Sequence, residues 1–539
     1  PHDLADLSSG AAPDLAARAV VVSASAHGRV DPAALRAFAE GGGVVLIDGP
    51  RSAAPLREGL LALAGARDGG GRGAFPADLV PPGLDDADVA DWRGAPVPLP
   101  DGGRLLLPAD VGTVDLGHGL FLARRVGRGR VVVAAVDVAR WLTTMLQGAP
   151  TRDDFTLEER HGDYEGILEP DDLVADPRLR TNEVPFADLL ARAVVRLLDP
   201  PDAPPLPRAL WFPAASQGVV LMTHDEDFQG GDATEEMHRW DERLGVKGTS
   251  FVIPHPRMEE DWTSDSLRLS LGLHWNRYPM PHGVGPVEPV AWTESCAEQM
   301  GRLKFARLLP TSGWSIGSNR NHYLIVGPTW TSTFRTLAGA GITIDSTFGA
   351  NKGRGHLFGT ARPYAILDEN GFPLPLRELP FVNQEDWGGA DARYFSRMFE
   401  TNAARHKGAL VLLFHPHLIV RTPAGAALFE HAARESLRTG HRPMTMDAFD
   451  SFWSRRTGST VRSEVVADRL RVTVRPRTSY EGAVGFEIAV PETWGRVASV
   501  SRGGGVPRPV VRRTIGGISH AVVEAGAGDG EFEFRFERE

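Results

Sequence analysis

Polar residues that could do chemistry stand directly behind an apolar run in the middle of the chain. The run GVVLM at 218–222 is typical of a buried strand, and THDED follows it at 223–227. Side chains two positions apart on a strand point the same way, so Asp225 and Asp227 can converge on one centre. Two carboxylates that share a site repel each other unless a cation or a proton lies between them. The segment is therefore either a solvated acidic loop or part of a catalytic or metal site.

Single histidines elsewhere could complete such a site. His274 follows a short apolar run, His322 lies two residues after Arg320, and His415 comes directly after LVLLF. Imidazole nitrogens and carboxylate oxygens are ligands that zinc accepts. Cys296 is the only cysteine of the chain, which excludes a multi-thiolate zinc site and an internal disulfide framework. His and Asp side chains are thus the available ligands for a divalent metal.

The order of five short motifs resembles the polysaccharide deacetylases, the NodB-homology domains of carbohydrate esterase family four. THDED, a helix and the strand TSFVI are similar to the TFDDG and ATFFV segments of that family. The similarity continues through LGLHWN, RNHYL, GITIDS and LFHP, over residues 215–450. The resemblance implies an irregular parallel (β/α) barrel and a hydrolase that removes N-acetyl groups with a divalent metal, most often zinc. Such a cation lowers the pKa of a bound water and stabilises an oxyanion.

The resemblance also implies roles for particular residues. Asp225 matches the base, His415 the acid that protonates the leaving amine, and Arg320 the residue that orients the base. Asp227 and His274 match the metal carboxylate and the first metal histidine. In this family one Asp and two His hold the metal, so a third ligand is still required.

The third ligand departs from the family pattern. The second metal histidine normally lies four positions after the first, where this chain has Tyr278. The alternatives are His282 on the same loop and His322 beside the arginine, and we favour His322 because His282 lies among Pro and Gly residues. Glu226, between the two aspartates, is a rival carboxylate for the metal.

Four further residues are assigned less directly. Asp386 is a further candidate catalytic residue, since an Asp and a Trp accompany the final histidine in the family and Asp386 and Trp387 are their nearest counterparts here. Trp275, Trp387 and Tyr323 are aromatic residues close to the motifs, and we predict that they bind substrate by stacking on sugar rings.

The regions on either side predict a multidomain α/β protein. Residues 1–205 alternate strand and helix, with Asp31 and Pro32 opening a helix, and resemble a flavodoxin-like, doubly wound, glutamine-amidotransferase-like domain with a parallel sheet. The nucleophile of glutamine amidotransferases is a cysteine, and no Cys precedes Cys296 in this chain. We therefore expect this domain to be non-catalytic. The proline-rich stretch 199–213 is predicted as a stiff linker, residues 206–457 as the deacetylase-like barrel, and residues 458–539, which alternate strongly, as a β-sandwich.

Composition restricts the partners. The 539 residues include 58 Lys and Arg against 69 Asp and Glu, a net charge of -11, so the basic excess that nucleic-acid binding needs is absent. Mean hydropathy is -0.19, and no apolar run approaches the ~20 residues of a membrane span. We therefore expect neither nucleic acid nor a membrane span. The pattern leaves the oligomeric state open.

The leading hypothesis is a deacetylase that acts on a bacterial surface or extracellular polysaccharide. Two alternatives remain open: hydrolysis of O-acetyl groups or another amide, and a catalytically inactive glycan-binding or assembly module with a degenerate metal site. An extracellular or cell-envelope location is expected from the substrate. Because the sequence opens at Pro1 without Met, we expect any targeting segment to lie outside it.

Overall fold

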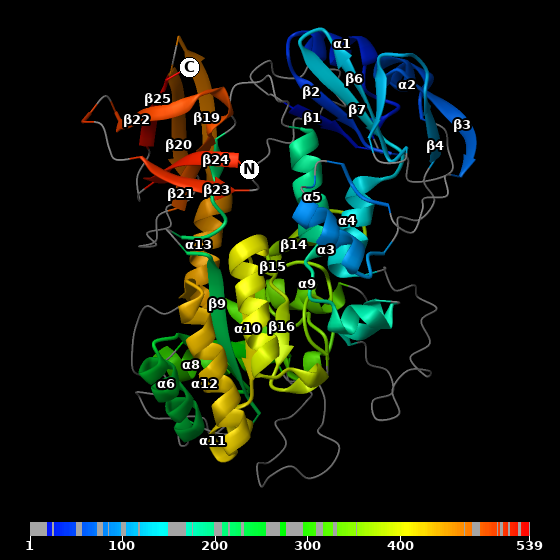
Figure 1. Cartoon of the computed structure of the whole chain (residues 1–539). Helices are drawn as coiled ribbons and strands as arrows, with labels where there is room; N and C mark the ends of the chain where they lie inside the picture. Colours follow the sequence, from blue (N-terminus) through cyan, green and yellow to red (C-terminus); the bar gives the residue numbers. More distant parts are fainter. Residues whose placement is uncertain are drawn as a thin grey trace.

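The structure is a computed structural model of the chain, and Figure 1 shows it as one large sheet with its helices below two smaller bodies. The described residues are 19–23, 26–49, 56–72, 79–82, 84, 86–98, 104–116, 119–148, 169–174, 176–198, 207–213, 216–227, 231–254, 270–275, 295–308, 316–326, 331–351, 353–467, 469–476, 486–503, 505–506, 510–515, 518–525 and 530–537.

The large sheet is curled and almost entirely parallel. Its strands follow the order β14-β15-β13-β12-β11-β10-β9-β17-β16, and the β14 and β15 pair is antiparallel. β18 pairs with the first residues of β9. The predicted barrel is thus confirmed in its coarse form, as a curled, open α/β sheet. The strands are β9 (Gly218–Glu226), β10 (Gly248–Val252), β11 (Leu271–Trp275), β12 (Ser318–Asn321), β13 (Ile344–Asp345), β14 (Tyr364–Leu367), β15 (Pro373–Glu378), β16 (Phe381–Gln384), β17 (Ala409–Phe414) and β18 (His441–Pro443).

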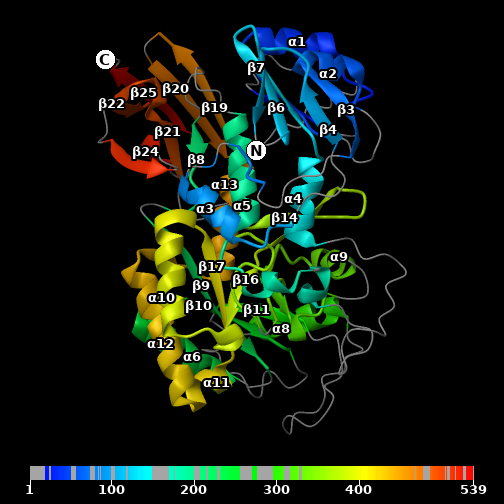
Figure 2. The ribbon, with the colours of Figure 1, turned by 45° about the vertical axis from the view of Figure 1, so that its right-hand side comes forward.

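The two faces of β9 enter different cores, as the two-residue period of a strand requires. Val219 and Leu221 pack toward α13, whereas Val220 and Met222 pack under the outer helices. The inward set continues to Thr223 and the two aspartates beyond it. Figures 1 and 2 show helices along the outside of β9 and β17. The helices around this sheet are α6 (Gly231–Leu244), α8 (Cys296–Leu308), α9 (Ser332–Gly339), α10 (Ala392–Thr401), α11 (Pro416–Arg421), α12 (Pro423–Arg438) and α13 (Met446–Gly458).

Two four-stranded antiparallel sheets follow α13 and share one core with it. Phe449 of α13 packs against Trp453 on the same helix and Phe212 before β9. Part of the stretch predicted as a linker is instead a strand of this region, because Arg208 and Ala209 (β8) pair with β21. The sheets are β19 (Ser459–Val466), β20 (Arg469–Pro476), β25 (Gly530–Glu537) and β22 (Arg496–Arg502), and β23 (Val511–Ile515), β24 (Ile518–Ala525), β21 (Phe486–Pro491) and β8.

The first sheet is mixed, whereas the sequence predicts a parallel one. β1, β2 and β7 are parallel, but β6 returns antiparallel to β7 across a short turn and β5 pairs antiparallel with β6. Asp31 caps α1 through the backbone N–H of Ala33 and Pro32 is the first helical residue, as predicted. The elements are β1 (Ala19–Val22), α1 (Pro32–Glu40), β2 (Val44–Ile47), α2 (Glu58–Ala64), β3 (Ala66–Arg72), α3 (Asp86–Gly94), β4 (Arg104–Pro108), β5 (Thr113–Leu116), β6 (Phe121–Val126), β7 (Gly129–Ala134), α4 (Val138–Gln147) and α5 (Phe186–Leu197).

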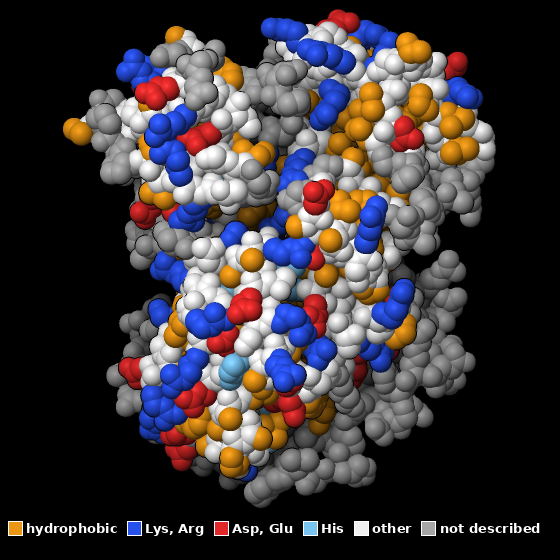
Figure 3. Space-filling view, in the orientation of Figure 1, with side chains coloured by type: hydrophobic (Ala, Val, Ile, Leu, Met, Phe, Trp, Pro, Cys, Tyr) orange, Lys and Arg blue, Asp and Glu red, His pale blue; other side chains and the backbone are white. Residues whose placement is uncertain are grey.

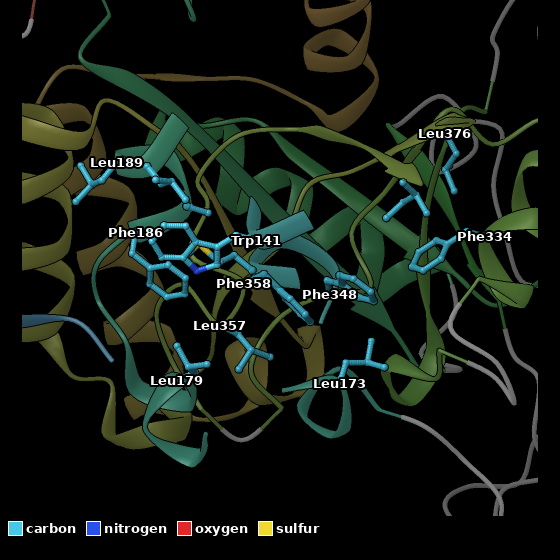
Figure 4. Close-up of a cluster of buried hydrophobic side chains, with 14 of the residues drawn as sticks. Trp141, Leu173, Leu179, Phe186, Leu189, Phe334, Phe348, Leu357, Phe358 and Leu376 are labelled. Atoms are coloured by element: carbon cyan, nitrogen blue, oxygen red, sulfur yellow. The ribbon is translucent and has the colours of Figure 1, made fainter. Parts of the chain in front are cut away.

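A common apolar core crosses the boundary that the sequence predicts at residue 205. Trp141 of α4 and Phe186 of α5 lie in one buried cluster with Phe348 and Phe358 from the region of the large sheet (Figure 4). The Asp188 carboxylate also accepts hydrogen bonds from the Thr360 hydroxyl at 2.8 Å and the Ala361 N–H at 3.0 Å. Residues before and after the predicted boundary are therefore packed together, and the boundary itself stays a prediction.

The described surface carries both charges. On the face in Figure 3, Lys and Arg side chains are interspersed with Asp and Glu over the large sheet and its helices. Among the helices that the structure describes, none is long and apolar enough to cross a membrane.

Candidate active site

The carboxyl ends of four parallel strands bring the predicted polar residues to one edge of the large sheet. β9 contributes Asp225 and leads to Asp227, β11 contributes His274, and β12 contributes Arg320 and leads to His322. His415 directly follows β17, which pairs with β9 on its other side. Ligand and catalytic groups of open α/β sheets gather at this edge. Residues almost 200 positions apart in sequence are thus within contact distance.

Asp227, His274 and His322 form a group that can hold one metal ion. Their ligand atoms all lie within 4.8 Å of one another. The Asp227 Oδ1 atom is 3.2 Å from His274 Nε2 and 3.5 Å from His322 Nε2. His274 Nδ1 lies 2.8 Å from the Arg320 carbonyl oxygen, to which it donates, and this bond turns Nε2 toward Asp227. One carboxylate and two neutral imidazoles fit a divalent cation that keeps an open position.

The protonation states in this group also suit a metal. Burial lowers the pKa of His322 to about 4, although the charge of Asp227 opposes the shift, so the imidazole is neutral at neutral pH. For Asp227, burial alone would raise the pKa, but the neighbouring His322, His274 and His415 together hold it well below its ordinary value. Neutral imidazoles and an ionised carboxylate are the forms that bind a cation.

Asp225 lies beside this group and is held by a buried arginine. Arg320 Nη1 donates to Asp225 Oδ1 at 2.9 Å and to the Thr223 hydroxyl at 2.7 Å. Arg320 is fully buried. Its Nε donates to the Ser346 carbonyl oxygen, and its Nη2 donates to the Ser346 hydroxyl. The second Asp225 oxygen is 3.9 Å from His274 Nε2. This carboxylate therefore has one oxygen fixed by Arg320 and the other directed at the metal group, the position of a base.

His415 faces the same group from the opposite side. Its Nε2 is 3.3 Å from Asp227 Oδ2, and its Nδ1 is 2.9 Å from Glu385 Oε1. The backbone N–H of His415 donates to the same Glu385 oxygen. Burial alone would lower the pKa of His415, but the charges of Glu385 and Asp227 raise it to about 10. The ring is therefore protonated at neutral pH and can act as a proton donor.

Glu385, and not Asp386, is the carboxylate that contacts His415. Glu385 is 4% exposed and has a left-handed backbone with φ of 39°, whereas Asp386 is exposed. The side-chain partners that the structure gives are Asp225, Thr223 and Ser346 for Arg320, and Glu385 and Asp227 for His415. The structure therefore does not bring Asp386 together with the other candidate residues, and the acid beside His415 is the residue that precedes it. The reason is the left-handed turn at the end of β16, which places the first acid of the pair inward and the second in solvent.

Replacing Glu385 by glutamine is expected to lower kcat for the hydrolysis proposed below by about 10- to 100-fold. The amide still accepts a hydrogen bond from the His415 ring, but it no longer stabilises the protonated imidazole by charge. The adjacent Asp386→Asn variant provides the matched control, and its kcat should stay within about twofold of wild type. Equal losses in the two variants, measured in parallel assays, would contradict the assignment of Glu385.

The remaining candidates are distributed differently. Glu226 faces the outer side of β9, next to Ser250 and Thr234, where burial raises its pKa to about 8, so it does not compete for the metal. Tyr323 places its ring 4.2 Å from that of His322. Trp387 is half-buried on the loop that follows Glu385. His282, Tyr278 and the side chain of Trp275 lie outside the described residues.

Comparisons with known proteins give only distant likenesses. No family model and no curated protein matches the sequence. A structure from Mycobacterium smegmatis that carries the name polysaccharide deacetylase is 16% identical, with a TM-score of 0.33 over 46% of this chain and 93% of that one. One of the same name from Pseudomonas aeruginosa PAO1 is 13% identical, with a TM-score of 0.31 over 44% and 92%. Puue allantoinase is 13% identical, with a TM-score of 0.30 over 45% and 92%. The case for a function rests on the residues of this chain.

Sequence patterns do not reveal the supporting residues Glu385, Thr223 and Ser346. Glu385 directly follows the apolar strand FVNQ, and an acid at a strand end is a usable signal once that strand is known to neighbour the strand of His415. Ser346 follows a strand of only two residues, which is too short for a periodic pattern. For Glu385, the information that the sequence lacks is the order of the strands in the sheet.

Behind the site, Asp345 and Glu378 form a buried acid pair on the face away from Arg320. They are direct partners in the pairing of β13 and β15, and both are fully buried. Burial raises the pKa of Asp345, and burial together with the neighbouring Asp345 raises that of Glu378 well above its ordinary value. Two adjacent buried carboxyls cannot both ionise, so the pair retains a proton in the folded state. Asp345 accepts a hydrogen bond from Asn319, and Glu378 accepts one from the Phe348 N–H.

Glu378→Gln is expected to flatten the fall of stability with rising pH. In the unfolded chain a glutamate ionises near its ordinary pKa, while the folded pair still holds its proton, so unfolding releases protons and stability declines above that pKa. The variant lacks this term. We therefore expect the unfolding temperature of the variant to rise relative to that of wild type between pH 5 and pH 8. At pH 8 the difference should be at least about 2 °C, the shift that about 1 kcal/mol produces in a domain of this size. Parallel curves for the two proteins would contradict this.

Proposed function

We propose that the protein is a metal-dependent hydrolase that removes N-acetyl groups from a bacterial surface or extracellular polysaccharide. The observation that carries the proposal is the convergence of two pairs on the group of Asp227, His274 and His322: the Asp225 and Arg320 pair reaches His274, and the His415 and Glu385 pair reaches Asp227. A carboxylate base on one side and a protonated imidazole on the other, with a cation site between them, suit hydrolysis of an amide. The family resemblance of the sequence motifs supports the same reading.

The residues divide the reaction between them. Asp227, His274 and His322 would hold the divalent cation, most simply zinc, which when bound lowers the pKa of water and stabilises negative charge on the carbonyl oxygen. Asp225 accepts a proton from the attacking water, and Arg320 keeps that carboxylate oriented.

His415 completes the reaction at the leaving nitrogen. An amine departs from an amide only when its nitrogen is protonated, so the reaction needs an acid opposite the base. His415 Nε2 points at the metal group, and its Nδ1–H donates to Glu385, which keeps the ring in place as the proton leaves. The products are acetate and the free amine of the sugar.

The experiment is metal analysis of the purified protein together with acetate release from N-acetylated chito-oligosaccharides and from an O-acetylated xylan. One metal ion per chain and acetate from the N-acetylated substrate are expected. Acetate from the xylan alone would assign the chain to O-deacetylation. A protein that binds no metal and releases no acetate, but retains glycans, would be a binding or assembly module. An extracellular or cell-envelope location is part of this proposal, because the substrate lies there.

A further inference from the structure

The metal ligand His322 is delivered by an unusual turn at the end of β12. Arg320 of this strand points inward to Asp225, so the two-residue period directs Asn319 and Asn321 to the other face. Directly after His322, Tyr323 and Leu324 both adopt left-handed backbone conformations, with φ of 55° and 57°. Non-glycine residues rarely occupy this region, and two in succession are strained. Something must therefore hold the turn in place.

The side chain of Asn321 closes that turn. Its Nδ2 donates to the Ile325 carbonyl oxygen at 2.6 Å, which bridges His322, Tyr323 and Leu324. Its backbone N–H donates to the Thr347 hydroxyl at 3.1 Å. Asn321 is 2% exposed, so its bonds are not in competition with water. Asparagine side chains commonly stabilise turns through such bonds to nearby backbone.

A second layer fixes Asn321 itself. Asn319 Nδ2 donates to Asn321 Oδ1 at 2.9 Å and to Asp345 Oδ1 at 2.6 Å. The other Asp345 oxygen accepts from the Thr347 N–H at 3.2 Å. Asn321 is thus held both by Asn319 and, through Thr347, by Asp345. The network forms a continuous path of bonds from the buried acid pair to the turn that carries the metal ligand.

We propose that Asn321 is a positioning residue for the metal site, which holds the strained turn so that His322 faces Asp227 and His274. The inference rests on the proposed function, because it requires that the three residues bind a metal. It explains how a histidine from the arginine motif can supply the third ligand. The left-handed pair reverses the chain directly after β12, and without the closing bond the turn relaxes and the imidazole withdraws.

The test is a double-mutant cycle on zinc affinity, with wild type, Asn321→Ala, His322→Ala and the double variant, each titrated with zinc against a chromophoric chelator. Asn321→Ala should weaken zinc binding about 10-fold or more in the presence of His322, the usual range for a residue that supports a ligand, and less than about twofold in its absence. An equal loss in both backgrounds would overturn the proposal, since Asn321 would then act on the whole fold.

Asn402→Ala is the matched control. Asn402 is also 2% exposed and also closes a turn, with its Oδ1 accepting from the Gly408 N–H at 2.8 Å at the start of β17, the opposite end of the sheet. This variant should lower the unfolding temperature and leave zinc affinity within about twofold of wild type. Loss of zinc affinity in Asn402→Ala as large as in Asn321→Ala would also overturn the proposal.

A second variant covers the case in which Asn321→Ala does not fold. Asn321→Asp has the same size and retains the acceptor for Asn319, but it lacks the donor to Ile325. It should weaken zinc binding in the same direction, and wild-type affinity in this variant would count against the inference alone. Absence of zinc from the wild-type protein would remove the proposed function and this inference together.

Discussion

Asparagine in place of Asp225 is expected to lower kcat for acetate release about 10³-fold, within the range that a general base contributes, and to leave the metal content unchanged. The amide is the same size and its oxygen can still accept the hydrogen bond from Arg320 Nη1, so the local geometry is retained. It cannot take a proton from water at neutral pH. Because Asp225 lies outside the group of three proposed metal ligands, metal analysis separates the loss of a base from the loss of the site.

Asp241→Asn is the matched control for this prediction. Asp241 is 2% exposed against 3% for Asp225, and from α6 it contacts His224 Nε2 at 3.0 Å on the outer side of β9. A carboxylate is removed from an equally buried position in both variants, but only Asp225 faces the metal group. The control should retain more than about half of the wild-type kcat. More than a tenth of wild-type activity in Asp225→Asn would rule out Asp225 as the base.

The sequence predicts Asp225 and Asp227 because they follow a recognisable apolar strand, whereas His274 and Arg320 are predicted from the family resemblance of their motifs. Apolar strands such as 218–222 are detectable from composition alone, and residues that end parallel strands share an edge whatever their order. Asp225, Asp227, His274 and Arg320 could therefore be named without a structure. Which acid would support His415 could not, because a one-residue choice between Glu385 and Asp386 depends on a left-handed turn that no periodicity encodes.

The fold could be predicted less completely than the site. Period-two patterns identify the strands after residue 458, but they do not show that the short segment Arg208–Ala209 joins the same sheets across almost 280 residues of chain. Similarly, the apolar face of α5 predicts burial without naming the partner, and its partners include Phe348 and Phe358. Long-range pairing is decided by tertiary packing, which local propensity does not report.

Strain and support are placed together in this site. Glu385, Tyr323 and Leu324 are left-handed non-glycine residues; Glu385 contacts His415, and Tyr323 and Leu324 are the two residues that follow His322. Such conformations persist only where surrounding bonds over-determine them, and here Asn321 and the backbone of His415 supply those bonds. The proposed metal group is thus preorganised by the chain before any ligand arrives.

His322→Ala is expected to weaken zinc binding by at least about 100-fold. The change removes one of three protein ligands, which costs more than the roughly 10–100-fold that loss of a supporting residue causes. Zinc should raise the unfolding temperature of wild type, since it binds the folded state, and should fail to do so in the variant. The measurement is a chelator competition titration with thermal unfolding in parallel.

Two histidine variants sharpen this result. His282→Ala removes the alternative ligand of the sequence pattern and should retain wild-type zinc affinity. His356→Ala removes another buried histidine, one that is not among the three proposed ligands. The His356 Nδ1 atom lies 3.2 Å from the Thr360 carbonyl oxygen. This variant should lower the stability of the fold without changing zinc affinity. Loss of zinc in His282→Ala with retention in His322→Ala would assign the third ligand to His282, on the loop after His274.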